Sequence, residues 1–299
     1  MADTDLFDEW MVRLASQLEP LPDKPEETVE NTLRALWQAA AGYPMTAEAA
    51  SNAALVALDP SAEQRLSELI AQRLAGVPLA HITGRQRFMN RDFLAGPEAL
   101  VPRKETEVLC QTALGLLANM SGSADTVPLV IDVCTGAGNL AITLALHHPQ
   151  CRVYAADLSA DCVRLTERNI AHFGVTGRVE AAQGDLLEPF DTLDFHAAVD
   201  LLTCNPPYIS ARKLDTMHRE IRDFEPRLAF DGGPLGVSVL YRLIKEAPRF
   251  LKQGGWLAFE VGLGQGPSVV KRMEKSGDYR EVRSVADAAG DIRAVLART

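Results

Sequence analysis

The chain has 299 residues, of which 47% are hydrophobic and 23% are charged, and its formal net charge is -10. This composition is that of a globular protein with a sizeable core, and the length fits one large domain or two. The sequence has no apolar run long enough to cross a membrane, which excludes a membrane-spanning protein. The acidic charge, without any Lys/Arg block, argues against a nucleic-acid-binding surface.

The N-terminus and the cysteines indicate a cytoplasmic protein. The first ten residues are acidic and lack a basic leader followed by an apolar stretch, so we expect no signal peptide. The cysteines form no C-x-x-C pair and lie in apolar contexts, which predicts reduced, mostly buried thiols. They are Cys110, Cys134, Cys151, Cys162 and Cys204.

Residues 1–80 are predicted to form a helical N-terminal domain. They hold 13 acidic and 5 basic side chains, a net charge of -8, so the rest of the chain carries only -2. Ser61, followed three residues later by Gln64, is typical of a capping box at a helix start. Apolar residues recur at helical spacing in four stretches, 6–18, 29–40, 47–58 and 66–74.

Residues 81–101 are predicted to form a β-hairpin linker, with a plain surface loop as the alternative. The stretch 85–93 mixes aromatic and polar side chains around the turn-prone Asn90-Arg91-Asp92.

From residue 102 to 299, strand patterns alternate with helical patterns. Helical stretches lie at 140–147, 160–173 and 238–252, and strand-like runs at 128–133, 152–156, 179–183, 198–204 and 256–261. Two further runs, 280–285 and 294–296, are expected to close the sheet as antiparallel strands. Repeated strand–helix units predict an α/β fold with a doubly wound, mostly parallel sheet of seven strands.

The first strand of this segment runs into Cys134-Thr135-Gly136-Ala137-Gly138. Glycines at this point allow a tight turn and a close approach of the backbone to a ligand. The helix that follows begins with free N–H groups, which dinucleotide folds use for phosphate. A lone Gly-x-Gly is also compatible with an ordinary strand–helix turn.

The next two strands end in acidic residues. Asp157 follows the second strand, where a carboxylate can accept hydrogen bonds from both hydroxyls of a ribose. Asp185 and Leu186 follow the third strand, where an acid can meet the amino group of an adenine. Each acid alone is more typical of a helix cap. The three strand ends together predict a site for an adenosine-containing ligand.

The fourth strand leads into Asn205-Pro206-Pro207-Tyr208. An amide or aromatic amino nitrogen is a poor nucleophile, and it needs acceptors for both N–H hydrogens before its lone pair can face a sulfonium methyl group. Asn205 offers a side-chain carbonyl, and Pro206 offers a backbone carbonyl held by the restricted φ angles of the two prolines. Tyr208 can form a flat wall beside the substrate. The alternative is a rigid turn that ends a strand.

From about residue 76 onward the chain resembles the protein-(glutamine-N5) methyltransferases that modify peptide chain release factors. The segments that carry the resemblance are 76–84, 101–107, 132–138, 205–208, 231–233, 259–262 and 287–290. The helical first segment and hairpin are also similar to that family's small substrate-recognition domain.

The resemblance implies a class I methyltransferase-like catalytic domain at 102–299 and S-adenosylmethionine as cofactor. Residues 134–138 would line its methionine portion, Asp157 the ribose, and Asp185 with Leu186 the adenine. Asn205 to Tyr208 would hold the glutamine amide, which in the family lies in a Gly-Gly-Gln loop of the release factor. No metal and no membrane partner are expected.

The chain departs from the family pattern around these loops. Cys134 replaces the usual glycine, Lys104 stands where proline is usual, and Asn139 and the run 234–236 also differ. Three alternatives therefore stay open: a different peptide or small-molecule acceptor, an adenine N6-methyltransferase, and a non-catalytic binding module. Glu225-Pro226-Arg227 is either part of an acceptor rim or a surface turn.

Overall fold

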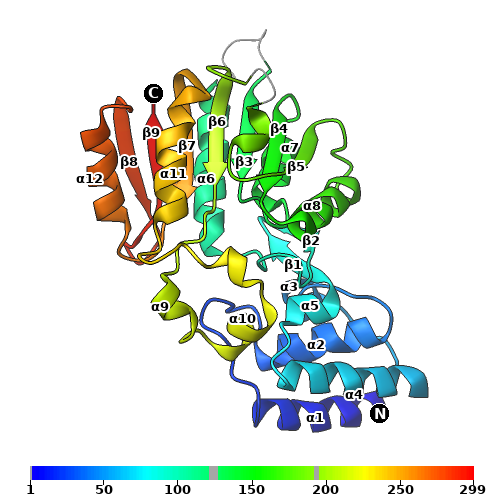
Figure 1. Ribbon diagram of the computed structural model, residues 1–299. Helices are drawn as coiled ribbons and strands as arrows, with labels where there is room; N and C mark the ends of the chain where they lie inside the picture. The colour runs from blue at the N-terminus through cyan, green and yellow to red at the C-terminus, as the bar shows by residue number, and fades with distance from the viewer. Residues whose placement is uncertain (1, 121–126, 192–194) are drawn as a thin grey trace. The chain divides into compact units, whose positions relative to one another are not determined.

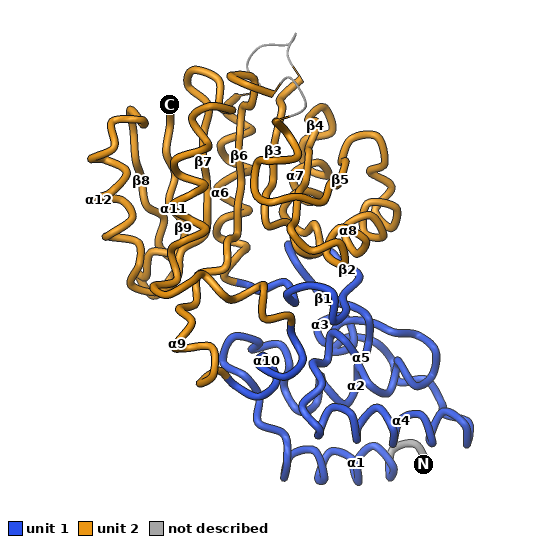
Figure 2. The backbone as a smooth tube through the Cα atoms, viewed as in Figure 1, with its two compact units in different colours: residues 1–104, 218–225 blue, residues 105–217, 226–299 orange. Residues whose placement is uncertain are grey.

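The computed structural model describes residues 2–120, 127–191 and 195–299. The chain forms two compact units (Figure 2). The helical unit contains residues 1–104 and 218–225, and the sheet unit contains residues 105–217 and 226–299. Residues 218–225 thus belong to the helical unit although they follow most of the sheet in the sequence.

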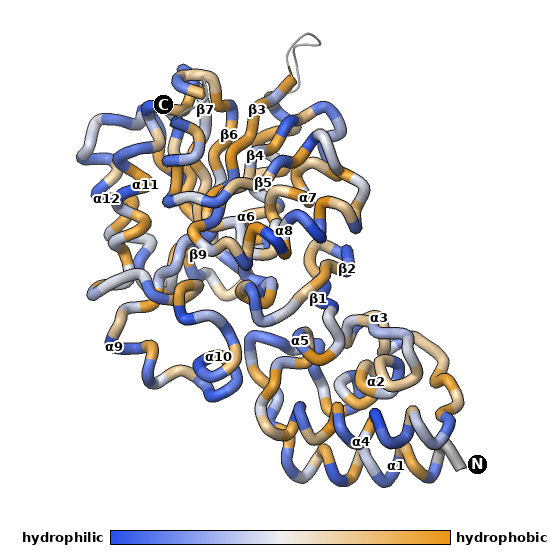
Figure 3. The backbone as a smooth tube through the Cα atoms, turned by 45° about the vertical axis from the view of Figure 1, so that its right-hand side comes forward, coloured by the Kyte–Doolittle hydropathy of each residue, from blue (hydrophilic) through white to orange (hydrophobic). Residues whose placement is uncertain are grey.

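Helices of the helical unit enclose an apolar core around Trp37, Leu36 and Leu66, all fully buried. Hydrophobic and hydrophilic residues alternate along α1 and α4, as expected for helices that bury one face (Figure 3). The helices are α1 (Ala2–Ala15), α2 (Val29–Ala40), α3 (Ala47–Asn52), α4 (Pro60–Leu74), α5 (Leu79–Thr83) and α10 (Arg219–Phe224).

The helix predicted at 47–58 is wrong beyond Asn52, where α3 ends. Side chains of α2 donate hydrogen bonds to backbone carbonyls of the segment after α3. Trp37 Nε1 donates to the Val56 carbonyl at 2.7 Å, and Gln38 Nε2 donates to the Ala54 carbonyl at 2.6 Å. These carbonyls are satisfied by tertiary hydrogen bonds, so the backbone can leave the helix without leaving polar groups unpaired.

The predicted capping box at Ser61 is also wrong. The N-cap of α4 is Asp59, whose Oδ1 accepts from the Ala62 N–H at 2.7 Å, and Ser61 only donates to the same carboxylate. Pro60 occupies the first turn, where its missing N–H costs nothing. The N-cap therefore lies two residues before the predicted Ser61.

The hairpin between β1 (Arg85–Phe88) and β2 (Arg91–Leu94) is present and antiparallel. Its turn is Met89-Asn90, both with positive φ angles of 48° and 59°. This is the backbone conformation of a two-residue hairpin turn, which matches the twist of the flanking strands. Arg91 and Asp92, expected in the turn, lie in β2.

The sheet unit confirms the predicted doubly wound fold (Figure 1). The strand order is β5-β4-β3-β6-β7-β9-β8, parallel except for the pairs formed by β9 with β7 and β8. The strands are β3 (Leu129–Val133), β4 (Arg152–Asp157), β5 (Val179–Gln183), β6 (Val199–Cys204), β7 (Leu251–Glu260), β8 (Glu281–Ala286) and β9 (Ile292–Arg298).

Helices of the sheet unit pack on these strands, and three short 3-10 turns (Glu188–Phe190, Arg227–Ala229 and Ala247–Arg249) lie between elements. The helix predicted at 238–252 ends at Glu246 because Pro248 has no N–H to continue it, and β7 already begins at Leu251. The helices are α6 (Glu105–Met120), α7 (Asn139–His147), α8 (Ala160–His172), α9 (Ala211–Leu214), α11 (Ser238–Glu246) and α12 (Gly266–Ser276).

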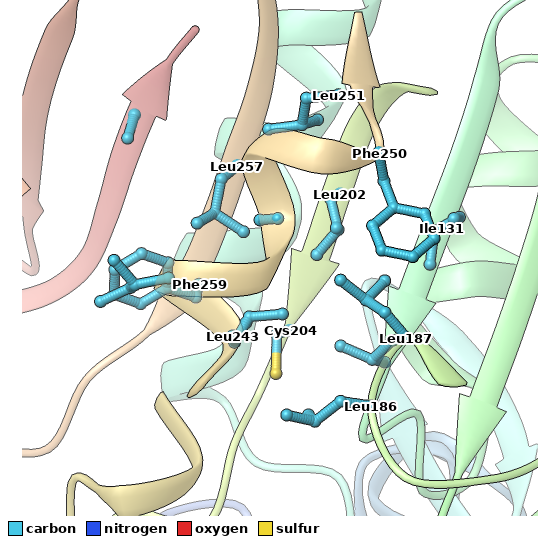
Figure 4. Close-up of a cluster of buried hydrophobic side chains, with 14 of the residues drawn as sticks. Ile131, Leu186, Leu187, Leu202, Cys204, Leu243, Phe250, Leu251, Leu257 and Phe259 are labelled. Atoms are coloured by element: carbon cyan, nitrogen blue, oxygen red, sulfur yellow. The ribbon is translucent and has the colours of Figure 1, made fainter. Parts of the chain in front are cut away.

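Alternation along the strands gives the sheet two different faces. Ile131, Leu202, Cys204, Leu257 and Phe259 belong to one apolar cluster together with side chains of α11 and α12 (Figure 4). The intervening residues of β3, β6 and β7 therefore point to the opposite face, where α6 and α7 contact the strands. That face receives the buried polar side chains at the carboxyl ends of these strands.

Candidate active site

Parallel pairing brings the predicted residues to one edge of the sheet. Val133 is opposite both Ala156 and Cys204, and Asp157 is opposite Gln183. The segments that follow β3, β4, β5 and β6 therefore leave the sheet at the same edge, as expected for ligand sites of doubly wound folds.

The turn after β3 is tight and left-handed at three positions, Cys134, Gly136 and Gly138. The two glycines differ in what a side chain at their position would meet. A Cβ on Gly136 would meet no atom within 4 Å, so the space beside this backbone is open to a ligand. A Cβ on Gly138 would lie 2.8 Å from Thr166 Cγ2 on α8. The absence of a side chain at Gly138 therefore permits the close packing of this turn against α8.

Asp157 connects the turn after β3 to the start of α8. Its Oδ2 accepts from the Gly136 N–H and its Oδ1 from the Ser159 N–H, each at 2.9 Å. Burial raises the pKa of Asp157, and these backbone hydrogen bonds oppose the rise. The N-cap of α8 is Ser159, which accepts from the Cys162 N–H. The alternative of Asp157 as the helix cap is therefore wrong.

Asp185 and Leu186 follow β5 with opposite environments. Asp185 is half-exposed and accepts from Arg242 Nη1 of α11 at 3.0 Å. Leu186 has a positive φ of 53° and lies buried in the apolar cluster of the sheet unit. Asp185 therefore forms an ion pair with Arg242 while its side chain stays partly accessible.

Asn205 and the residues up to Tyr208 form the loop after β6. The Nδ2 atom of Asn205 donates to Thr106 Oγ1 on α6 at 3.0 Å. The Tyr208 carbonyl accepts from Gln265 Nε2 at 3.0 Å, and Gln265 also accepts from the Gly262 N–H at 2.9 Å. The loop is thus tied to α6 on one side and to the segment after β7 on the other.

Two buried acidic residues that were not among the predicted site residues lie at the same carboxyl edge of the sheet. Asp132 is fully buried, and its two oxygens accept from Thr135 and Thr203 hydroxyls, each at 2.6 Å. Glu260, the last residue of β7, is 1% exposed. An acid at the end of a strand was the signal used for Asp157. Glu260 ends β7 and Asp132 is the penultimate residue of β3, so a search of the last two strand positions would have found both.

Burial raises the pKa of Asp132 to about 6, against the opposing effect of its hydroxyl donors. We expect this to make stability pH-dependent. The folded state holds the proton more tightly than the unfolded state, so this stabilisation is full below the unfolded pKa and is lost as pH rises through about 6. Two pKa units correspond to about 3 kcal/mol of unfolding free energy.

The measurement is the difference in unfolding free energy between the wild type and Asp132→Asn, from urea titrations at several pH values. As the pH rises from about 4 to about 7, the wild type should lose up to about 3 kcal/mol of unfolding free energy relative to Asp132→Asn. Asp161→Asn, at an exposed position of α8, is the control and should give curves parallel to the wild type. Parallel curves for Asp132→Asn would refute the raised pKa.

The described residues contain no group of three or more His, Cys, Asp or Glu side chains that could hold a metal ion. No described helix is long and apolar enough to span a membrane. The five cysteines are free thiols, and all except the half-buried Cys134 are buried.

The sequence matches two family models. Residues 9–84 match the PrmC N-terminal domain, and residues 111–237 match the methyltransferase small domain. Among solved structures, the N-terminal domain of human METTL16 has a TM-score of 0.53 at 14% identity and covers 77% of this chain and 82% of that chain. At this identity the likeness shows the fold alone.

Curated relatives match over most of their length. A release factor glutamine methyltransferase of Moorella thermoacetica is 38% identical over 80% of this chain and 81% of its own. One of Streptomyces coelicolor is 37% identical over 77% of each chain. The chain therefore belongs to the release factor glutamine methyltransferase family.

Proposed function

We propose that this protein transfers the methyl group of S-adenosylmethionine to the side-chain amide nitrogen of a glutamine in a peptide chain release factor. The relatives' names support this acceptor, and the loop after β6 supports the chemistry. The observation that carries the proposal is the orientation of Asn205: its NH2 group is engaged by Thr106, so its carbonyl oxygen remains to accept from a substrate NH2.

The residues at the carboxyl edge fit the cofactor. The open space beside Gly136 suits a ligand that approaches the backbone, and Cys134, Thr135, Gly136, Ala137 and Gly138 would surround its methionine portion. Asp157 would hold the ribose hydroxyls with the lone pairs left by its two backbone donors. Asp185 and Leu186 would contact the adenine.

S-adenosylmethionine would supply an activated methyl group on a positively charged sulfur. The chain would contribute mainly orientation. The carbonyls of Asn205 and Pro206 would accept the two N–H hydrogens of the glutamine amide and turn its lone pair away from conjugation. Pro207 stiffens the loop, and the Tyr208 backbone is held in place because its carbonyl accepts from Gln265 Nε2.

No general base is needed before methyl transfer. The nitrogen becomes far more acidic once it carries the methyl group, and its extra proton can then leave to water. This agrees with the hydrogen bonds of Asp157 and Asp132, which accept from the Gly136 N–H and from the Thr135 hydroxyl.

The test is incubation of the purified protein with labelled S-adenosylmethionine and a bacterial cell extract, followed by mass spectrometry of the labelled species. We expect one methyl group on the glutamine of the Gly-Gly-Gln loop of a release factor. A purified release factor with that glutamine changed to leucine should remain unlabelled. Label in a small metabolite or in adenine of a nucleic acid would replace the proposed acceptor.

A further inference from the structure

The side-chain amide of Gln265 joins three separate segments of the sheet unit. Its Nε2 donates to the Tyr208 carbonyl at 3.0 Å and to the Gly236 carbonyl at 3.2 Å, and its Oε1 accepts from the Gly262 N–H at 2.9 Å. Tyr208 lies in the loop after β6, Gly236 lies just before α11, and Gly262 lies just after β7. The nitrogen and the oxygen of one half-buried amide are thus both engaged with backbone groups.

Strand pairing explains why these segments meet. β6 and β7 are parallel neighbours, with Cys204 opposite Phe259 (Figure 1). The chain therefore leaves both strands at the same edge of the sheet. Gln265 is the N-cap residue of α12, and its backbone N–H donates to the Gly262 carbonyl at 3.0 Å. This tight turn keeps residue 265 beside the end of β7, within reach of the loop after β6.

The segment around Gly236 is already paired with the loop after β6 through the backbone. The Ile209 N–H donates to the Phe230 carbonyl at 2.9 Å, and the Gly232 N–H donates to the Ile209 carbonyl at 2.9 Å. These two segments therefore form one backbone-paired unit. Gln265 connects this unit to the segment that follows β7.

Two glycines leave room for the amide and for Tyr208. A Cβ on Gly262 would lie 3.0 Å from Gln265 Oε1 and 3.0 Å from Tyr208 Cδ2. A Cβ on Gly236 would lie 2.3 Å from the Tyr208 carbonyl oxygen. The backbone at these positions is approached more closely than a side chain would permit, so Tyr208 is confined from both sides.

The three backbone partners specify an amide at position 265. Two carbonyl oxygens require hydrogen-bond donors and one N–H requires an acceptor, and a glutamine side chain offers two hydrogens on its nitrogen and lone pairs on its oxygen. A glutamate has the same size and shape, but its carboxylate only accepts. It would direct an oxygen at the carbonyls of Tyr208 and Gly236.

We propose that Gln265 is a positioning residue for methyl transfer: by fixing the Tyr208 carbonyl to the segment after β7, it sets where Asn205 and Pro206 present their carbonyls to the methyl acceptor. This role rests on the proposed function, since it concerns the same site. Gln265 acts through the loop after β6. A displacement of about 1 Å in the reacting groups can cost about 100-fold in rate, so a looser loop lowers turnover.

The main test compares kcat of the wild type, Gln265→Met and Gln265→Glu with a release factor as acceptor. Gln265→Met keeps much of the side-chain volume and removes the hydrogen bonds, and it should lower kcat about 10- to 100-fold. Gln265→Glu should lower kcat further, because its carboxylate is repelled by the two carbonyl oxygens. A role in packing alone predicts the opposite order, since glutamate is the closer match in shape.

Two further measurements separate positioning from folding. Affinity for S-adenosylmethionine, measured by calorimetry, should change less than about threefold, because the turn 134–138 is held by Asp157 through the Gly136 N–H. The melting temperature of Gln265→Glu should not fall, since a negative charge at the N-terminus of α12 is favourable. Hydrogen exchange of the Gly262 amide should be faster in Gln265→Met than in the wild type, because its acceptor is removed.

A second variant moves the same groups without changing Gln265. Gly262→Ala places a methyl group against Tyr208 and the amide oxygen, and it should also lower kcat with little effect on cofactor affinity. Its matched control is Gly115→Ala on α6, where a Cβ would meet no atom within 4 Å. The control for the glutamine variants is Gln253→Glu, at an exposed position of β7. Both controls should retain wild-type kcat.

Wild-type kcat in Gln265→Met, or a higher kcat in Gln265→Glu than in Gln265→Met, would overturn the role of Gln265, as would unchanged exchange of the Gly262 amide. If Gln265→Glu does not fold, Gln265→Met and Gly262→Ala decide. A wild type that fails to methylate the release factor would instead refute the proposed function, and hydrogen exchange at Gly262 would still report on the contact with Gln265.

Discussion

Replacing Asn205 with alanine is expected to remove methyl transfer while S-adenosylmethionine still binds. The alanine lacks the carbonyl that would hold one N–H of the acceptor amide, and loss of one such fixed polar contact costs about 100- to 1,000-fold in kcat. The turn 134–138 and Asp157 are joined to each other by the Gly136 N–H and not through Asn205. Affinity for S-adenosylmethionine, measured by calorimetry, should therefore stay within about tenfold of the wild type.

Two variants separate this expectation from a general loss of structure. Asn119→Ala, at an exposed position of α6, removes an asparagine whose Nδ2 donates to the Gly115 carbonyl, and it should retain wild-type kcat. Asp157→Ala should show the reverse pattern, with binding of S-adenosylmethionine lost first. Parallel loss of binding and turnover in Asn205→Ala would contradict the role given to this side chain.

Replacing Glu220 with glutamine is expected to destabilise the helical unit severely. Glu220, on α10, accepts from Lys24 and from Arg73 Nη1, the latter at 2.5 Å, and Arg73 Nη2 also bonds to Glu27 at 3.0 Å. All four side chains are 2% or 3% exposed. Two cations and two carboxylates balance in this cluster, so the variant leaves one buried positive charge without compensation. Breaking a buried pair in this way costs about 3–5 kcal/mol.

The measurement is urea unfolding, together with hydrogen exchange of the α10 amides. Glu220→Gln should lower the unfolding free energy by that amount and increase exchange in α10. The matched control is Glu30→Gln, because Glu30 pairs with Arg34 on the surface of α2 and such pairs contribute at most about 1 kcal/mol. Similar losses in both variants would show that burial does not matter here.

The sheet was predictable because local pattern and final environment agree. The strands that became β3 and β6 read as short, mostly apolar runs, since both faces of a central parallel strand are covered by helices. Gly136 lies three residues after β3, Asp157 ends β4 and Asn205 follows β6 directly, so parallel pairing brings all three to one edge. For this part of the molecule, sequence order and spatial order are linked by a simple geometric rule.

Long-range contacts explain where prediction failed. The segment after Asn52 has apolar residues at helical spacing, but it is not helical, because Trp37 and Gln38 donate hydrogen bonds to its backbone carbonyls. Glu225 looked like part of a rim or a surface turn, yet it is 5% exposed and accepts from the Val101 N–H at 2.9 Å and from Arg103. No local pattern indicates that residues 218–225 join the helical unit, because their partners lie more than a hundred residues away.

The sequence by itself determined the class of fold and the strand ends at which the candidate site residues lie, because strand periodicity and strand-end residues are local properties. Only the tertiary structure decided the direction in which the Asn205 amide faces and the different surroundings of Gly136 and Gly138. It also decided that α10 belongs to the helical unit. Each of these depends on a partner distant in the chain (Thr106, Thr166 and Lys24, respectively), and a buried polar or close-packed group is defined by the partner it meets.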